Sequence, residues 1–140
     1  MLRIYSKGCE HVLRALTRIP LDQCDQQFLA RDICRQAKVP ETPTRKSLQA
    51  LVKAGLLAAV TGPGGGYRFA VHPSKISLFL IITAVDGEAV FNQCIMGLPE
   101  CSQCQPCPIH ESWAKLKGQM VRELERKTIG QLMQTVKERQ

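Results

Sequence analysis

The sequence contains no run of 18 apolar residues, which excludes a conventional membrane-spanning helix. Its start, MLRIYSKGCEHVLRAL, lacks the solid apolar stretch and small-residue cleavage site of a secretion signal. We therefore expect a reducing, cytoplasmic location. No internal repeat or low-complexity tract is present. No Ser/His/Asp or Cys/His arrangement suited to nucleophilic catalysis is evident, so we expect neither an enzyme nor a small-molecule substrate.

The chain has 140 residues and a formal net charge of +7, and the positive excess lies mostly in one half. Residues 1–70 carry 11 Lys and Arg against 5 Asp and Glu, whereas residues 71–140 carry 8 against 7. A basic half beside a near-neutral half indicates either a surface for a polyanion such as DNA or only a solvated basic face. Charge alone does not separate these two interpretations.

Apolar periodicity predicts a mainly α-helical chain with one small β-hairpin. The expected helices cover residues 2–18, 26–37, 42–54, 73–86, 109–126 and 128–136. Two short β segments, 56–60 and 67–71, flank the sequence TGPGGG and predict a hairpin with a glycine-rich tip. Helices joined by a tight turn and followed by such a hairpin make a winged helix-turn-helix.

This order of elements predicts four parts of the chain. They are a winged helix-turn-helix over 1–72, a connecting helix over 73–91, a cysteine loop over 92–108, and a long helix with a short C-terminal helix over 109–140. The long helix carries an apolar stripe at helical spacing, made of Trp113, Leu116, Met120, Val121 and Leu124. One small domain does not need this stripe, so we expect two copies of the helix to pair about a two-fold axis.

The third helix of a winged helix-turn-helix enters the major groove of DNA. Thr42 is predicted to cap this helix, and its first turns are predicted to present Thr42, Thr44, Arg45 and Lys46 to the bases. Arg45 suits the two acceptors of guanine. The alternative is that Arg45 and Lys46 only face solvent.

Other residues are predicted to contact the DNA backbone and the minor groove. Ser6 and Lys7, at the start of the first helix, combine a hydroxyl, a cation and N–H groups suited to a phosphate. Gly64, Gly65 and Gly66 would let the backbone of the wing approach the minor groove closely. The alternative is a flexible glycine loop without a DNA contact.

Seven cysteines are present, and an odd number argues against a disulfide framework. Four of them form the spacing C-x6-C-x2-C-x2-C-x2-H, which ends at a histidine: Cys94, Cys101, Cys104, Cys107 and His110. Thiolates bind iron–sulfur clusters, zinc or copper, and five ligands exceed the four that one metal site needs. Structural zinc and reactive thiols without a metal are the alternatives. The other three lie on apolar helix faces and are predicted core residues: Cys9, Cys24 and Cys34.

The sequence resembles the IscR/NsrR-type winged-helix repressors, the "Rrf-two" family, over nearly its whole length. The resemblance rests on YSKG, VPETPTRKSLQALVKAGLL, TGPGGGY, ITAVDGE and CPIHESW. It implies a homodimeric transcription regulator that binds a double-stranded DNA operator. It also implies a 2Fe–2S or 4Fe–4S cluster that controls DNA affinity in response to redox state, nitric oxide or iron–sulfur supply.

The resemblance places the family's three loop ligands at Cys94, Cys101 and Cys107, with Cys104 extra to the pattern. It implies His110 as the fourth ligand, and the alternatives are Cys104 or Glu10 of the partner subunit.

Two positions depart from the family pattern in the DNA-reading half. Thr61 stands where relatives often place Arg before GPGGG, and Arg45 stands where some relatives carry Glu. We therefore expect a weaker minor-groove contact and a different operator. Two rival functions are a zinc- or thiol-oxidation-based regulator and an iron–sulfur electron carrier. The basic charge and the winged helix argue against the carrier.

Overall fold

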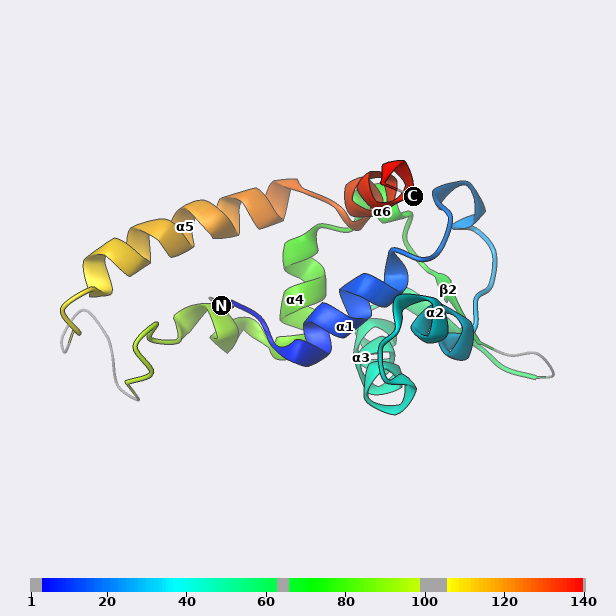
Figure 1. The fold of residues 1–140 in the computed structure, drawn as a ribbon, viewed down its shortest axis with the longest axis horizontal. Helices are drawn as coiled ribbons and strands as arrows, with labels where there is room; N and C mark the ends of the chain where they lie inside the picture. The colour runs from blue at the N-terminus through cyan, green and yellow to red at the C-terminus, as the bar shows by residue number, and fades with distance from the viewer. Residues whose placement is uncertain (1–3, 63–65, 99–105, 140) are drawn as a thin grey trace.

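The structure is a computed structural model that describes residues 4–62, 66–98 and 106–139, and it confirms a mainly helical fold with one antiparallel hairpin (Figure 1). The first half contains α1 (Lys7–Leu16), η1 (Leu21–Gln23), α2 (Ala30–Ala37), α3 (Glu41–Lys53), β1 (Leu57–Val60) and β2 (Gly66–Phe69). The second half contains η2 (Pro73–Lys75), α4 (Leu78–Asp86), η3 (Glu88–Asn92), α5 (His110–Arg126) and α6 (Ile129–Glu138). The η elements are short 3₁₀ helices.

Helix α1 begins at Lys7 rather than at residue 2, because Ser6 caps it. The backbone of Ser6 is extended, and its hydroxyl accepts a hydrogen bond from the N–H of Cys9 at 3.1 Å. A side chain that satisfies an unpaired N–H of the first turn fixes a helix start. The apolar spacing therefore predicted too long a helix at this end.

Helix α2 begins at Ala30 rather than at residue 26, because Phe28 pairs with the wing. The N–H of Phe28 donates to the carbonyl of Tyr67 at 2.7 Å, and the N–H of Tyr67 donates back at 2.8 Å. The ring of Phe28 also lies near the rings of Tyr67 and Phe69, with centroids 6.1 and 6.0 Å apart. This pairing holds the backbone of Phe28 extended and so keeps it out of the helix.

Helix α3 begins at Glu41, after Pro40, so the predicted cap at Thr42 is wrong by two positions. The helix is followed by Ala54 and then by Gly55 with φ +82°. A left-handed residue after a helix is most easily supplied by glycine, so the predicted end of this helix is confirmed.

The expected helix over 73–86 is split into η2 and α4, with Ser77 as the cap of α4. At the split, the N–H of Leu78 donates to the carbonyl of Lys127 at 2.8 Å, and the N–H of Ile129 donates to the carbonyl of Ile76 at 2.9 Å. These bonds fasten the start of α6 to the start of α4. Ile129 and Met133 are consequently buried in the same core as α1, α2 and α3.

Helix α5 lies at the edge of this core, against which Val121 and Leu124 of the predicted stripe pack while partly buried. Figure 1 shows it extending from the body of the molecule, and the two strands of the hairpin lie at the opposite end. None of its residues is buried. In the part of the chain that the structure describes, no helix is long and apolar enough to cross a membrane.

Candidate nucleic-acid interface and cysteine pair

Helix α3 turns one polar face to solvent. Thr42, Arg45, Lys46 and Gln49 are all exposed, and their i, i+3, i+4, i+7 spacing places them on one side of the helix. The opposite side packs into the core through residues that include Leu48 and Leu51. Three of the four residues predicted to face the bases, Thr42, Arg45 and Lys46, therefore share one exposed face of α3, and two of them are cations.

Thr44 does not belong to this face, and its predicted contact with a base is wrong. Its side chain is 0% exposed, and its hydroxyl donates to the carbonyl of Pro40 at 2.6 Å. Thr44 follows Thr42 by two residues, which is a rotation of about 200° around a helix of 3.6 residues per turn. Its side chain therefore points toward the core.

Arg45 is held by a surface ion pair. Its Nε lies 2.9 Å from Oε2 of Glu41, one turn earlier on α3, and both side chains are substantially exposed. Exposed i,i+4 pairs contribute only about 0.3–0.5 kcal/mol. The guanidinium can therefore exchange Glu41 for a base or a phosphate at little cost.

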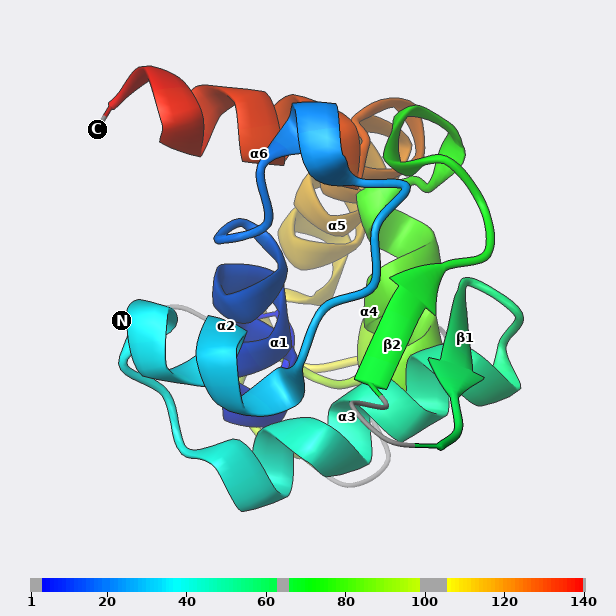
Figure 2. The ribbon, with the colours of Figure 1, turned by 90° about the vertical axis from the view of Figure 1, so that its right-hand side faces the viewer.

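A hollow of about 230 Å³ lies between α3 and the hairpin, which lie beside each other in Figure 2. Its walls include Arg45 and Gln49 of α3 and Ala59, Gly66 and Tyr67 of the two strands. Across this hollow, Nε2 of Gln49 donates a hydrogen bond to the hydroxyl of Tyr67 at 2.8 Å. Sequence reasoning missed Gln49, although its helical spacing from Arg45 and Lys46 could have revealed it.

Ser6 and Lys7 were predicted to hold a phosphate, and the structure changes this prediction for Ser6. The N–H of Ser6 donates to Asp86 at 2.7 Å, and its hydroxyl donates to the same carboxylate at 2.5 Å. Both donors are thus already used by a carboxylate, which would also repel a phosphate. Lys7 is exposed at the start of α1, so the predicted phosphate contact rests on its ammonium group.

Gly66 is required by the interior of the protein. A β-carbon on Gly66 would lie 2.3 Å from the carbonyl oxygen of Phe28 and 3.1 Å from Cδ2 of Leu29. Real β-carbons essentially never come so close to a backbone atom. The absent side chain lets β2 dock against residues 28–29, while Gly64 and Gly65 lie outside the described residues.

In the cysteine loop, two of the predicted ligands lie together. Sγ of Cys94 and Sγ of Cys107 are 3.8 Å apart, and Cys107 is buried. Two sulfur ligands of one tetrahedral metal, each about 2.3 Å from it, lie about 3.8 Å apart. The pair therefore fits a shared metal ion or cluster iron, and it is too far apart for a disulfide, whose sulfurs are about 2.05 Å apart.

The other predicted ligands are Cys101, Cys104, His110 and Glu10. Cys101 and Cys104 lie outside the described residues. His110, half-buried, begins α5, and its N–H donates to the carbonyl of Cys107 at 3.0 Å. Glu10 is half-buried on α1. Among the described residues, no group of three or more His, Cys, Asp or Glu side chains is placed to hold a metal.

The remaining cysteines are core residues, as predicted. Cys9, Cys24 and Cys34 are all buried. Burial, together with the nearby charge of Asp86, raises the pKa of Cys9 to about 12, and burial also raises the pKa of Cys34. Thiolates bind metals and thiols do not, so neither Cys9 nor Cys34 is suited to ligation or redox sensing near neutral pH.

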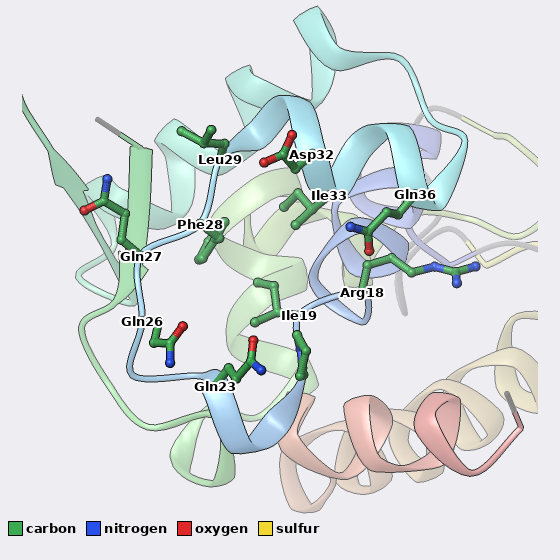
Figure 3. A pocket seen from close by; sticks show the side chains of 11 residues that line it. Arg18, Ile19, Gln23, Gln26, Gln27, Phe28, Leu29, Asp32, Ile33 and Gln36 are labelled. Carbon is green, nitrogen blue, oxygen red and sulfur yellow. The ribbon is translucent and has the colours of Figure 1, made fainter. Parts of the chain in front are cut away.

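A larger hollow, of about 530 Å³, lies between α2 and the segment that connects α1 to α2 (Figure 3). Ile19, Phe28 and Ile33 point into it, and Arg18 points outward at its rim. Glutamines make up much of the remaining wall. None of its lining residues belongs to α3 or to the cysteine loop, so it is separate from both predicted sites.

Together, the exposed basic face of α3 and the two-stranded wing beside it define a DNA-binding protein of the winged-helix class. The chain belongs to the Rrf2 family, which is described as "Iron-dependent Transcriptional regulator" and whose match covers residues 5–135. The resemblance found in the sequence is thereby confirmed. The relatives are named as transcriptional regulators rather than as enzymes.

Individual relatives agree with this membership. The chain is 30% identical over 132 residues to the HTH-type transcriptional regulator IscR of Vibrio cholerae, covering 94% of this chain and 75% of the relative. Its fold is similar to that of B. subtilis CymR, a global cysteine regulator, with a TM-score of 0.74, 18% identity and coverage of 96% and 98% of the two chains. It is also similar to T. potens IscR, with a TM-score of 0.72, 21% identity and coverage of 96% and 89%.

Proposed function

We propose that this DNA-binding regulator is a homodimer whose affinity for its operator is controlled by an iron–sulfur cluster. The observation that carries the proposal is the pair of sulfurs of Cys94 and Cys107, 3.8 Å apart, in a loop that also contains Cys101. The similarity to regulators named IscR and the iron-dependent description of the family support it. His110 completes the proposed ligand set, and Cys104 or Glu10 of the partner subunit are the alternatives.

A chain of contacts connects the cysteine loop to the DNA-reading half. Trp113 of α5 donates its indole N–H to the carbonyl of Gln93 at 3.1 Å, next to Cys94. On the other side of η3, Asp86 accepts two hydrogen bonds from Ser6 at the start of α1. Cys94 and Cys107 would hold the cluster, and these contacts give a change at Cys94 a route to the start of α1. The cluster shifts the equilibrium only to the extent that it binds one arrangement better than the other.

The proposed dimer explains the exposed apolar side chains of α5. Leu116 and Met120 are 60% and 47% exposed, and Ile109 before the helix is 40% exposed. Full burial of an aliphatic side chain contributes roughly 1.5–3 kcal/mol. Pairing α5 with the same helix of a second subunit would cover this surface symmetrically. It would also set the distance between the two copies of α3.

Anaerobic purification followed by visible absorption and iron and sulfide analysis tests the cluster. We expect a coloured protein that contains iron and sulfide. Single replacements Cys94→Ala, Cys101→Ala and Cys107→Ala should each abolish iron binding, whereas Cys104→Ala should retain it. A colourless protein with zinc in place of iron would refute the proposal. Retention of iron by Cys107→Ala would refute the ligand assignment.

A second candidate function, a thiol-oxidation regulator, is favoured by the same pair of sulfurs. A movement of less than 2 Å would bring them to the disulfide distance of about 2.05 Å. A similar solved structure, of Staphylococcus aureus CymR, is of an oxidized form. Under this alternative, the metal-free protein would change its DNA affinity when it is treated with an oxidant, and mass spectrometry would find a disulfide between Cys94 and Cys107.

A further inference from the structure

Gln49 lies where the recognition helix and the wing meet. It occupies the exposed face of α3, one turn beyond Arg45, and it lines the hollow of about 230 Å³ between α3 and the hairpin. The hydrogen bond from its Nε2 to the hydroxyl of Tyr67, at 2.8 Å, spans that hollow. This hydrogen bond holds the amide of Gln49 in one orientation. It does so at a cost in side-chain entropy, which an unbonded glutamine on the helix surface would keep.

Tyr67 is itself rigidly held. Its side chain is 7% exposed, and its backbone exchanges two hydrogen bonds with Phe28, of 2.7 and 2.8 Å. The hydroxyl that accepts the hydrogen bond from Gln49 is therefore held in place by the core. A side chain that recognises a ligand selectively needs such support from a neighbouring buried group.

We infer that Gln49 reads an adenine in the major groove and that Tyr67 positions its amide for this purpose. The inference rests on the proposed entry of α3 into the major groove. A glutamine amide has two N–H donors and one carbonyl acceptor. One N–H is given to Tyr67, which leaves one donor and the acceptor. These match N7 and the N6 amino group of adenine, which present one acceptor and one donor side by side.

The two cationic side chains on the same face, Arg45 and Lys46, are not suited to adenine. Arg45 and Lys46 carry only donors, which suit guanine or phosphate, whereas adenine requires a donor and an acceptor together. Thr42 is the other exposed side chain of this face that offers both, through one hydroxyl. Gln49 is thus the amide on this face that suits bidentate recognition of adenine.

Selection of binding sites from a randomised DNA duplex library tests the inference with the full chain. The variants are Gln49→Glu, Gln49→Ala and Tyr67→Phe, and the matched control is Gln36→Glu, which adds the same charge at an exposed position of α2 outside this face. For the wild type we expect an operator with a preferred adenine at one position of each half-site. For Gln49→Glu we expect that position alone to change from adenine to cytosine, because a carboxylate accepts from the N4 amino group of cytosine and cannot donate to N7 of adenine.

The expected magnitudes follow from the worth of a bidentate contact. Gln49→Ala should lose roughly 5- to 150-fold of the preference for adenine at that position, and Tyr67→Phe should lose a smaller part of it. Gln36→Glu should select the wild-type operator. If Gln49→Glu and Gln49→Ala select the same bases as the wild type, the role of Gln49 is refuted while the proposed DNA function stands. Unchanged selectivity in Tyr67→Phe would overturn the positioning role. A wild type that enriches no motif would overturn the proposed DNA function, and the inference with it.

Discussion

Replacing Gly66 with alanine tests whether the wing depends on its close approach to the body of the protein. The new β-carbon would lie 2.3 Å from the carbonyl oxygen and 3.2 Å from the carbonyl carbon of Phe28, neither of which is the end of a flexible side chain. Strand β2 would have to move away, which would break the two hydrogen bonds between Phe28 and Tyr67. At about 0.5–1.5 kcal/mol for each bond, we expect the free energy of unfolding to fall by about 1–3 kcal/mol.

Urea unfolding followed by far-ultraviolet circular dichroism measures this loss. Gly8→Ala is the matched control, because its β-carbon would meet only Oγ of Ser47 at 3.6 Å and Oγ of Ser6 at 3.7 Å, both ordinary contacts. Alanine is a better helix former than glycine, so the control should be stabilised by up to about 1 kcal/mol. If Gly66→Ala unfolds at the urea concentration of the wild type, the close approach of β2 does not stabilise the wing and the reasoning fails.

Four further predictions concern the dimer, two DNA contacts and a buried thiol. The double variant Leu116→Glu, Met120→Glu should sediment as a monomer at concentrations where the wild type is a dimer, because charges would replace the apolar surface of α5. Lys7→Ala should weaken binding to operator and random DNA alike and reduce the slope of log K against log salt by roughly one unit per subunit. Arg45→Ala should cost about 1–3 kcal/mol on the operator and much less on random DNA. Cys9, with a pKa raised from 9.0 to about 12, keeps its proton in the folded protein where the unfolded chain has lost it, so the free energy of unfolding should fall as pH rises through this window.

Three of these predictions have a stated outcome that would contradict them. A double variant of α5 that remains a dimer in analytical ultracentrifugation would place the interface elsewhere. Equal losses on both duplexes for Arg45→Ala would make that residue a phosphate contact. Other groups also titrate above pH 9, so Cys9→Ala must show a weaker dependence of unfolding on pH than the wild type does. An identical pH dependence in the two proteins would contradict the role given to Cys9.

The sequence was sufficient for several features that depend on neighbouring residues. Gly55 ends α3 because a left-handed residue is needed after the last turn, and the pattern from His110 to Arg126 predicts α5 almost to the residue. The helix was expected over 109–126, one residue longer than observed, and both features are local enough to be visible as periodicity or as a glycine after the last turn. The family resemblance was likewise visible in the sequence.

The sequence was insufficient where distant segments meet. Asp86 reaches Ser6 from 80 residues away, so the hydroxyl assigned to a phosphate holds a carboxylate instead. Phe28 is kept out of α2 by Tyr67, and Gly66 is required by the backbone of Phe28. No local pattern records these contacts.

The candidate site divides in the same way. By itself the sequence determined the class of protein, the basic recognition helix and the cysteines that form the candidate cluster loop, because charge, periodicity and ligand spacing are written along the chain. Only the tertiary structure decided that Thr44 is buried, that Gln49 is joined to Tyr67, and that the sulfurs of Cys94 and Cys107 lie 3.8 Å apart. These depend on how far each helix is rotated and on which loops fold back, and packing of the whole core sets both.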